Sequence, residues 1–421
     1  MLPLAGIRIV DLTMVWSGPY CTMQLANFGA EVIKIESATS RGPANVPRGS
    51  GIFPDGDPGQ RPWNRAGLTN ILNSSKLSLT LDLTRPEGVN IFKRLVKVSD
   101  VVIDNFRATV MERFGLGYET LRQVNPSIIV VAMSANGMNG PERDYAAFGA
   151  TLEQTTGMAW LTGYGGANDP PYRGGVNYPD PVAGLHAACA ILAALRHRRR
   201  TGKGQFVDLS QREAATCIVG ESILDFTLNG RIPERRGNRR PSQAPHGCYR
   251  CKGDDMWVTI AVGNDEQWKR FAEAIGNPPW TADQRFRTVL DRLRNQDDLD
   301  RLVEEWTSER DHIEAMHLLQ KAGIPAGAVH NNVELLEDPH LAERGFFQWV
   351  EHPDAGTHLY QGASVKLSET PGGIQSPAPC LGEHNDYVLR EVLNLSPEEI
   401  LELHSKGVTN NDPRSVSARS G

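Results

Sequence analysis

Short runs of β-branched residues alternate with amphipathic stretches over the first 135 residues of the chain. Residues 7–11 and 31–36 are β-branched runs and predict buried strands. Between them, Gly18 and Pro19 are typical of a helix start, and Gly29 marks the end of that helix. A strand, a helix and a second strand within about 30 residues form a βαβ unit, which implies parallel pairing with a right-handed crossover.

The same alternation continues along the chain and extends the predicted sheet. Further strands are predicted at residues 78–82, 101–103, 128–133 and 205–210. Helices are predicted at residues 86–98, 119–124, 181–197 and 211–228. Elements in this order predict an α/β fold with a Rossmann-like, doubly wound large domain.

A change in composition predicts a second, smaller domain. Residues 229–245 are rich in Arg, Pro and Gly and are interpreted as a linker. Beyond it, strands are predicted at residues 256–261 and 325–329, and helices at residues 266–275, 296–308 and 311–322. This pattern predicts a small α+β domain over residues 246–345.

The last part of the chain is expected to return to the large domain. Short strands follow residue 346, and two helices are predicted at residues 384–393 and 397–405. The large domain then comprises residues 1–228 and 346–421. The final residues, from Thr409 onward, are polar and are expected to be disordered.

A stretch rich in glycine and proline runs from Arg41 to Arg65. Loops this long without periodicity are usually functional lids or linkers. Trp63 within the stretch favours a loop docked on the protein over a linker.

Composition narrows the functional classes. The 421 residues include 44 Lys+Arg and 50 Asp+Glu, for a formal net charge of −6. This balance argues against a nucleic-acid surface, which shows clustered excess Lys and Arg. No apolar run approaches the roughly 18–20 residues of a membrane span, and residues 1–11 lack the features of a signal peptide. Six cysteines are too few for a disulfide scaffold, which favours a reducing compartment. Taken together, these features predict a cytoplasmic enzyme with no nucleic-acid or membrane partner.

Dinucleotide binding is the first hypothesis for an opening βαβ unit. The turn after the first strand, LTMVWSGP, lacks the G-x-G-x-x-G spacing, and no P-loop pattern occurs. A nicotinamide or flavin cofactor is therefore disfavoured, although the crevice at the carboxyl ends of the strands is still the expected ligand site. Cys248 and Cys251 form a C-x-x-C without the second ligand pair that structural zinc requires. We predict no metal site and interpret both as ordinary cysteines.

Two charged features flank the predicted apolar helix. The basic run 198–203 ends it, where cations interact favourably with a helix C-terminus; phosphate binding is the alternative. Asp180 immediately precedes Pro181, so the residues alone favour its interpretation as the N-cap of the helix. A carboxylate at a helix N-terminus also stays ionised, and it can attack an activated acyl group to form a mixed anhydride.

The motifs together resemble those of the class III (family III) CoA-transferases, which include formyl-CoA transferase and carnitine CoA-transferase. The related α-methylacyl-CoA racemases share the fold. The matching segments cover nearly the whole chain in order and spacing. They are LAGIRIVDLT, SGPYCTMQLANFGAEVIKIE, PWNR, LNSSKLSLTLDL, DVVIDNF, MERFGLGYETL, PDPVAGLHAACAILAAL, RRTGKGQFVDLSQREA, PHGCYRCKGDDMWVTIAVGNDEQWKRF, AGIPAG and PCLGEHNDYVL.

The resemblance implies that Asp180, just before the long apolar helix, is the catalytic nucleophile. It would attack the acyl-CoA thioester and release CoA thiolate, with transfer passing through an aspartyl mixed anhydride and an aspartyl-CoA thioester. The residues implied to bind CoA are Trp16, Ser17, Leu81, Thr84, Asn105, Phe106, Arg107 and Arg113. Arg107 and Arg113 suit phosphate because a guanidinium binds it in a bidentate manner, and a solvated helix face is the alternative.

Several positions depart from the family pattern. Ser37 stands where the family often has a basic residue, and Arg41 is the candidate substitute. Thr84 stands in place of the lysine of formyl-CoA transferase, with Arg85 adjacent. The glycine-rich loop that shields the aspartate in formyl-CoA transferase has no counterpart, which disfavours formate or oxalate as a substrate. We therefore expect the 41–65 loop to exclude water from the anhydride.

Racemase chemistry is disfavoured by a further departure. The racemases pair the aspartate with a histidine, and the aligned position here is Phe148, which cannot shuttle a proton. The sequence predicts an acyl-CoA:carboxylate CoA-transferase that moves CoA from a donor such as succinyl-CoA to an aromatic or dicarboxylic acid. Acyl-CoA is its substrate, and no tightly bound cofactor is expected.

Two alternatives stay open: an α-methylacyl-CoA racemase or isomerase, and a CoA-binding subunit of a heteromeric CoA-transferase. The family resemblance also implies an interlocked homodimer, or a heteromer with a paralogous subunit.

Overall fold

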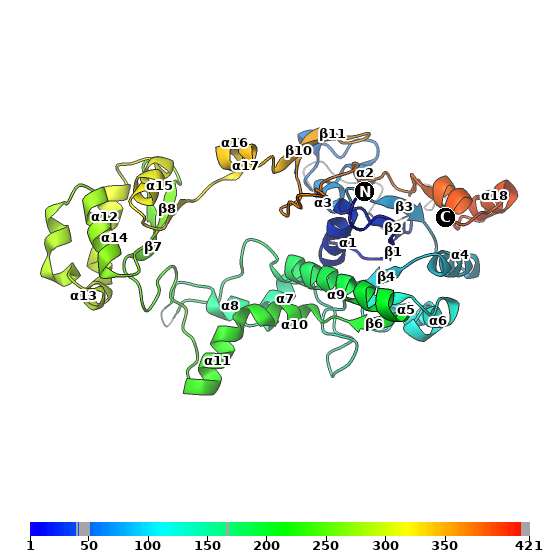
Figure 1. The fold of residues 1–421 in the computed structure, drawn as a ribbon, viewed down its shortest axis with the longest axis horizontal. Coiled ribbons are helices and arrows are strands. Elements are labelled where there is room, and N and C mark those ends of the chain that lie inside the picture. Colours follow the sequence, from blue (N-terminus) through cyan, green and yellow to red (C-terminus); the bar gives the residue numbers. More distant parts are fainter. Residues whose placement is uncertain (39–40, 42–50, 166–167, 414–421) are drawn as a thin grey trace. The chain divides into compact units, whose positions relative to one another are not determined.

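The computed structural model describes residues 1–38, 41, 51–165 and 168–413 (Figure 1). The chain divides into two compact units. The larger comprises Met1–Ala159, Arg173–Arg231 and Glu343–Gly421, and the smaller comprises Trp160–Tyr172 and Ile232–Ala342. The segment Trp160–Tyr172, which the sequence places with the large domain, thus groups with the smaller unit.

A parallel β-sheet forms the centre of the larger unit. Its strands within the described residues are β1 (Arg8–Asp11), β2 (Glu31–Glu36), β3 (Leu77–Thr80), β4 (Val101–Asp104), β5 (Ile129–Ala132) and β6 (Gln205–Asp208). Their order across the sheet is β3-β2-β1-β4-β5-β6, and every neighbouring pair is parallel. The predicted α/β fold with a parallel sheet is confirmed. The order reverses between β1 and β4, which is the switch point where open parallel sheets bind ligands.

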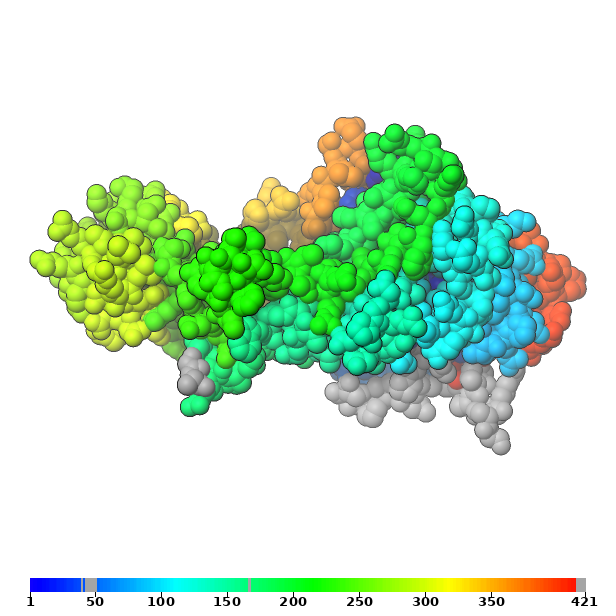
Figure 2. Space-filling model, turned by 90° about the horizontal axis from the view of Figure 1, so that it is seen from below, coloured from blue at the N-terminus to red at the C-terminus, as the bar shows by residue number. Residues whose placement is uncertain are grey.

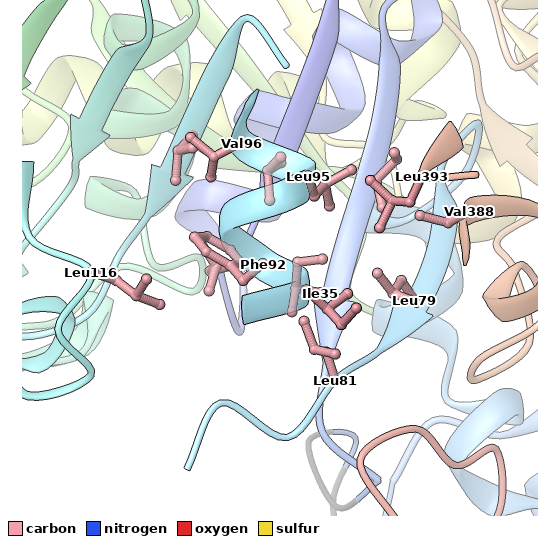
Figure 3. Packing of buried hydrophobic residues seen from close by; sticks show 14 of the residues in the cluster. Ile35, Leu79, Leu81, Phe92, Leu95, Val96, Leu116, Val388 and Leu393 are labelled. Carbon is pink, nitrogen blue, oxygen red and sulfur yellow. The ribbon is translucent and has the colours of Figure 1, made fainter. Parts of the chain in front are cut away.

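One face of this sheet packs against helices and the end of the chain. The elements there are α4 (Pro86–Lys97), α5 (Val110–Arg113), α6 (Tyr118–Val124), the π-helical turn Tyr387–Val392 and α18 (Pro397–Ser405). Figure 3 shows Phe92, Leu95 and Val96 of α4 lying against the sheet, and Val388 and Leu393 from the end of the chain belong to the same cluster. Their three- and four-residue spacing forms the apolar stripe of α4, which is why this segment is an amphipathic helix.

The C-terminal segment also covers the edge strand β3. The backbone N–H of Thr80 donates to Asn385 Oδ1 (2.8 Å), and that of His384 donates to the carbonyl of Ser78 (3.0 Å). The outer edge of β3 would otherwise present unpaired backbone groups. Residues about 300 positions apart in the sequence are therefore hydrogen-bonded along this edge.

The opposite face of the sheet packs against α1 (Ser17–Asn27), α9 (Pro179–Thr201) and α10 (Gln211–Thr216). Helices α1 and α9 approach closely because Gly184 has no side chain: a Cβ there would lie 2.6 Å from the carbonyl oxygen of Ser17. This contact brings the first turn of α1 beside the first turns of α9. As predicted, Arg198 to Arg200 lie in the last turn of α9, where Arg198 donates to Asp100 (2.6 Å).

Several elements between residues 62 and 161 were not predicted from the sequence. They include α2 (Pro62–Arg65), α3 (Gly67–Leu72), α7 (Gly149–Thr155) and α8 (Met158–Leu161). The helix predicted at residues 211–228 is divided into α10, the 3₁₀ turn Cys217–Val219 and α11 (Gly220–Asn229). After residue 346, β10 (Phe347–His352) and β11 (Gly356–Gln361) form an antiparallel hairpin.

The smaller unit is built on an antiparallel sheet, as its predicted α+β pattern requires. Its described strands are β7 (His246–Arg250), β8 (Trp257–Ala261) and β9 (Ala326–Ala328). Helices around them are α12 (Asp265–Ala274), α13 (Val289–Arg294), α14 (Gln296–Thr307), α15 (His312–Lys321), α16 (Asn332–Glu337) and α17 (Pro339–Glu343). An aromatic core of Trp268, Phe271, Phe286 and Trp306 packs between helices and sheet. Burial raises the pKa of Cys251, the second cysteine of the C-x-x-C pair, to about 11.

The described part of the chain contains neither a candidate membrane span nor a candidate metal site. No helix there is both long enough and apolar enough to cross a membrane. In the same residues, no three His, Cys, Asp or Glu side chains are grouped as metal ligands. Residues 42–50 of the proposed lid and residues 414–421 of the expected disordered tail lie outside the described part.

Candidate active site

The candidate site lies at the carboxyl ends of β1 and β4. The chain leaves β1 at Asp11 and enters α1 at Ser17 through a turn, residues 12–16. Asn105 follows β4 and holds this turn with two hydrogen bonds to the backbone of Met14, both 2.8 Å. The Asn105 amide also lies 3.3 Å from Ser17 Oγ. Asn105, predicted to bind CoA, therefore fixes the turn that borders the site.

Asp180 is the second residue of α9 and is 7% exposed. The prediction that it caps α9 is wrong: the backbone is already helical at Tyr178, and no side chain caps this helix. Instead, the backbone N–H of Ser17, at the start of the neighbouring α1, faces the carboxylate and favours its charged form. Burial raises the pKa of Asp180 to about 6, against the lowering effect of this N–H.

Gly149, the first residue of α7, lies against the other side of Asp180. A Cβ at this position would overlap Oδ2 of Asp180 and lie 2.8 Å from Cβ of Asn177. The preceding residue, Phe148, is 67% exposed. The position aligned with the racemase histidine is thus adjacent in sequence to the residue that contacts Asp180.

A second carboxylate of α7 shapes the loop before Asp180. Glu153 is 2% exposed, and its Oε1 accepts the backbone N–H of Gly174 at 2.7 Å. Gly174 lies six residues before Asp180, so this bond holds the loop that leads into α9. Sequence reasoning missed Gly149 and Glu153 because neither belongs to a predicted element or motif.

A cavity of about 590 Å³ opens on the β2 and β3 side of the turn. Three of the predicted CoA-binding residues, Leu81, Thr84 and Phe106, line it. They lie there together with residues of the turn, Thr13, Met14 and Val15. Trp16 and Ser17 continue this turn toward Asp180, so one short segment borders both the cavity and the carboxylate. Arg107 and Arg113 are exposed and are not among the lining residues.

Charged groups at this cavity are largely paired with each other. Arg41, proposed as a substitute for a phosphate-binding residue, instead binds Glu36 through two 2.6 Å hydrogen bonds. Both side chains are nearly buried, and Arg41 lowers the pKa of Glu36 against its burial. Arg85 lies 3.1 Å from Asp82. The guanidinium groups of Arg41 and Arg85 therefore already have carboxylate partners. Arg107 and Arg113, which follow Asn105 in the sequence, are exposed cations.

A buried polar cluster lies beneath the turn. Asp11 accepts hydrogen bonds from the backbone and hydroxyl of Thr13 (2.8 and 2.5 Å) and from Thr22 (2.6 Å). Lys76 and Lys34 complete the cluster, and Lys34 donates to the carbonyl of Thr13 at 2.6 Å. Lys34 and Lys76 lower the pKa of Asp11 to about 2, against the effect of its burial. This cluster was not predicted from the sequence, and its charged members come from the end of β1, the middle of β2 and the residue before β3.

Comparison with known proteins gives matches along most of the chain. The family profile described as CoA-transferase family III matches residues 4–385. The succinyl-CoA–D-citramalate CoA-transferase of Chloroflexus aurantiacus is 36% identical over 412 residues, covering 96% of this chain and 98% of that protein. The β subunit of the succinyl-CoA–L-malate CoA-transferase of the same organism is 33% identical, covering 97% and 98%. A formyl-CoA:oxalate CoA-transferase of Rhodopseudomonas palustris is 32% identical, covering 99% of each.

Solved structures match as well. A CAIB/BAIF family protein from Brucella suis superposes with a TM-score of 0.82 at 29% identity, covering 93% of this chain and all of that one. A hypothetical protein from Mycobacterium tuberculosis gives a TM-score of 0.73 at 27% identity, covering 91% and 98%.

Proposed function

The chain belongs to CoA-transferase family III, and from this premise we propose that Asp180 is the nucleophile that carries CoA from an acyl-CoA to an organic carboxylate. The family and the enzyme class predicted from the sequence are confirmed. The observation that carries the proposal is the setting of Asp180. Its carboxylate is buried between the start of α1 and the start of α7, where the Ser17 N–H favours its charged form.

This setting suits covalent chemistry. With a pKa of about 6, the carboxylate is mostly ionised at neutral pH. Because burial removes most of its water, it is a better nucleophile than a solvated carboxylate. The Ser17 N–H fixes the direction of one oxygen, which orients the carboxylate for attack.

The transfer proceeds through two kinds of covalent intermediate. A carboxylate oxygen of Asp180 attacks the donor thioester carbon, the C–S bond breaks, and CoA thiolate leaves a mixed anhydride. The thiolate then attacks the Asp180 carbonyl of the anhydride and releases the donor acid, which gives an aspartyl-CoA thioester. The acceptor carboxylate attacks this thioester and forms a second anhydride, again with release of thiolate. Attack of thiolate on the acceptor carbonyl yields the new acyl-CoA and restores Asp180.

The larger unit is proposed as the CoA-binding domain. The nucleotide part of CoA would occupy the cavity lined by Leu81, Thr84 and Phe106. Its pantetheine arm would follow the turn past Trp16 and Ser17 to Asp180. Arg107 and Arg113 would bind the phosphates, since both guanidinium groups are exposed. CoA is a substrate in this scheme, and the proposal includes no tightly bound cofactor.

The substrates are proposed from the relatives. Three matching proteins are named for succinyl-CoA as donor, with D-citramalate or L-malate as acceptor. We propose succinyl-CoA as the donor and a dicarboxylic acid as the acceptor. Racemase chemistry is the second candidate, and the exposed Phe148 at the start of α7 disfavours it because no proton-shuttling side chain occupies that position.

The active form is proposed to be an interlocked homodimer. Every residue of α11, which lies on the face shown in Figure 2, is at least partly exposed. Large apolar side chains exposed on α9 and α11 are Leu185, Leu192, Ile223, Leu224, Phe226 and Leu228. An apolar surface of this kind usually marks an interface. Because two relatives are named as α and β subunits, a heteromer with a paralogous chain is the alternative assembly.

Trapping of the intermediate tests the proposal directly. The protein is incubated with succinyl-CoA and candidate dicarboxylic acids, treated with hydroxylamine, and digested for mass spectrometry. A hydroxamate at Asp180, absent in Asp180→Ala, is the expected result. Transfer activity retained by Asp180→Ala would refute the nucleophile. Brisk deuterium exchange at the α-carbon of a 2-methylacyl-CoA would favour the racemase, and activity only with a co-expressed paralogue would favour the heteromer.

A further inference from the structure

Lys76 is a fully buried lysine whose ammonium group has a complete set of acceptors. It lies just before β3, and its Nζ donates to Asp11 Oδ2 (3.1 Å), the carbonyl of Pro19 (3.0 Å) and Asn73 Oδ1 (3.0 Å). An ammonium has three N–H donors, so none is left unused. A lysine is almost never fully buried unless such partners are present.

The three bonds converge on the segment that carries Ser17. Asp11 ends β1 and holds Thr13 at the start of the turn, while Pro19 lies in the first turn of α1. Lys76 therefore ties both ends of residues 12–19 to one point. Within this segment Val15 has a φ of +66°, a left-handed conformation that a β-branched residue adopts only when its surroundings impose it.

The segment held in this way carries the N–H that faces the nucleophile. Ser17 follows the strained Val15 by two residues. The start of α1 lies against α9, since a Cβ at Gly184 would be 2.6 Å from the Ser17 carbonyl oxygen, and the Ser17 N–H favours the charged form of Asp180. Asn105 supports the outer side of the turn through Met14, whereas Lys76 and Asp11 support the inner side. Burial lowers the pKa of Lys76 to about 8 and charge pairing keeps that of Asp11 at about 2, so both are charged at pH 7.

We propose that Lys76 is a positioning residue for CoA transfer: with Asp11, it fixes the 12–19 segment so that the Ser17 N–H stays directed at Asp180. The inference rests on the proposed role of Asp180 as the nucleophile. Lys76 does not touch Asp180 and acts only through the backbone of this segment. A buried ion pair that merely stabilises the fold would be the simpler role, so the test must measure more than stability.

The main variant is the double substitution Lys76→Met with Asp11→Asn. It removes both charges of the pair together, so that neither Asp11 nor Lys76 is left as the unpaired buried ion that a single substitution would create at a cost in folding. The matched control is Arg198→Met, which breaks the Arg198–Asp100 pair at the opposite end of β4. Hydrogen exchange of the Ser17 amide, followed by mass spectrometry of peptides over residues 12–20, reports on the bond to Asp180 without requiring activity.

In the double variant we expect the Ser17 amide to exchange at least about tenfold faster. On the acid side of the pH profile, the apparent pKa of kcat should rise by roughly half to one unit. The reason is that Asp180 loses an N–H that favours its ionised form. We expect kcat to fall about ten- to a hundredfold, with KM for the acyl-CoA changed less than about threefold. Arg198→Met should leave all of these values unchanged.

Unchanged exchange and an unchanged acid limb in a folded double variant would overturn the proposal. If the double variant does not fold, Thr13→Val, which removes only the hydroxyl bond to Asp11, should give the same shifts at smaller amplitude, and their absence would count equally against it. Full transfer activity in Asp180→Ala would instead refute the nucleophile, while the exchange data would still report whether Lys76 holds the turn.

Discussion

Gly149 lies directly against the carboxylate of Asp180: a Cβ at position 149 would overlap Oδ2 of the aspartate and lie 2.9 Å from its Cγ. Since φ at Gly149 is not positive, an alanine there is not strained in its own backbone. Gly149→Ala should therefore displace the Asp180 side chain and lower kcat at least about tenfold. Steady-state kinetics with the preferred acyl-CoA and acid measure this effect.

Gly175→Ala is the matched control for this substitution. Gly175 lies in the loop before Asp180, and a Cβ there would meet no atom within 4 Å. We expect wild-type kinetics from it. Equal activity of both alanine variants would show that Asp180 does not need its present position.

The transfer rate should depend on the ionisation of Asp180. Because its pKa is about 6 and only the carboxylate is nucleophilic, the rate should fall about tenfold per pH unit below pH 6. Release of CoA thiol in a single turnover without acceptor acid measures the first step alone, with a donor that carries no free carboxyl group. A rate that stays flat down to pH 4.5 would contradict this assignment.

Asp104, at the end of β4, makes stability depend on pH. Burial raises its pKa from 3.8 to about 7, so between these values the folded protein holds a proton that the unfolded chain has lost. Stability contributed by this group is therefore lost as pH rises toward 7. Asp104→Asn keeps an acceptor for the Phe106 N–H and should gain about 2–3 kcal/mol more in free energy of unfolding at pH 8 than at pH 5. Urea unfolding measures it, and Asp144→Asn at an exposed position should show no such difference.

The Arg41–Glu36 pair should behave as a buried ion pair. Both side chains are almost inaccessible, so Arg41→Met leaves a buried carboxylate without its main partner and should cost about 3–5 kcal/mol of stability. The double variant Arg41→Met with Glu36→Met should recover most of this loss. Denaturant unfolding of the single and double variants gives the coupling energy, and additive losses would contradict the pairing.

The assembly proposal makes a prediction for α11. Leu228 is 71% exposed, and placing a charge there would oppose burial in an interface. Leu228→Glu should shift the protein toward monomers in analytical ultracentrifugation. Leu401→Glu on α18, at a leucine that is 67% exposed, is the control and should leave the mass unchanged. A protein that sediments as a monomer without substitution would refute the dimer.

The sheet was predictable because each strand is short, apolar and followed by a turn or helix signal. Strands β1, β2 and β5 begin and end within about one residue of the predicted positions. The elements that were missed lack such a signal. Helix α7 has no strong apolar periodicity, and its first residue is held in place by contact with Asp180.

The residues of the candidate site were likewise predictable only in part. Asp180 was identified by family resemblance, but its local interpretation as an N-cap failed because its partner, Ser17, comes from a helix more than 160 residues earlier in the sequence. Arg41 appeared available to a phosphate, and only the tertiary structure shows that Glu36 binds it. Local sequence indicates which residues can do the chemistry, whereas packing between distant segments decides which partners they have.

The hydrogen bonds between β3 and residues 384–385 have a consequence for biosynthesis. The edge strand is made early, but its cover is separated from it by 305 residues. At about 5–20 residues per second, the ribosome needs roughly 15–60 s to supply that cover. During this interval the exposed backbone of β3 is open to chaperones or to misassociation, and the whole smaller unit is synthesised before the cover appears. The N-terminal part of this chain is therefore the last to be completed.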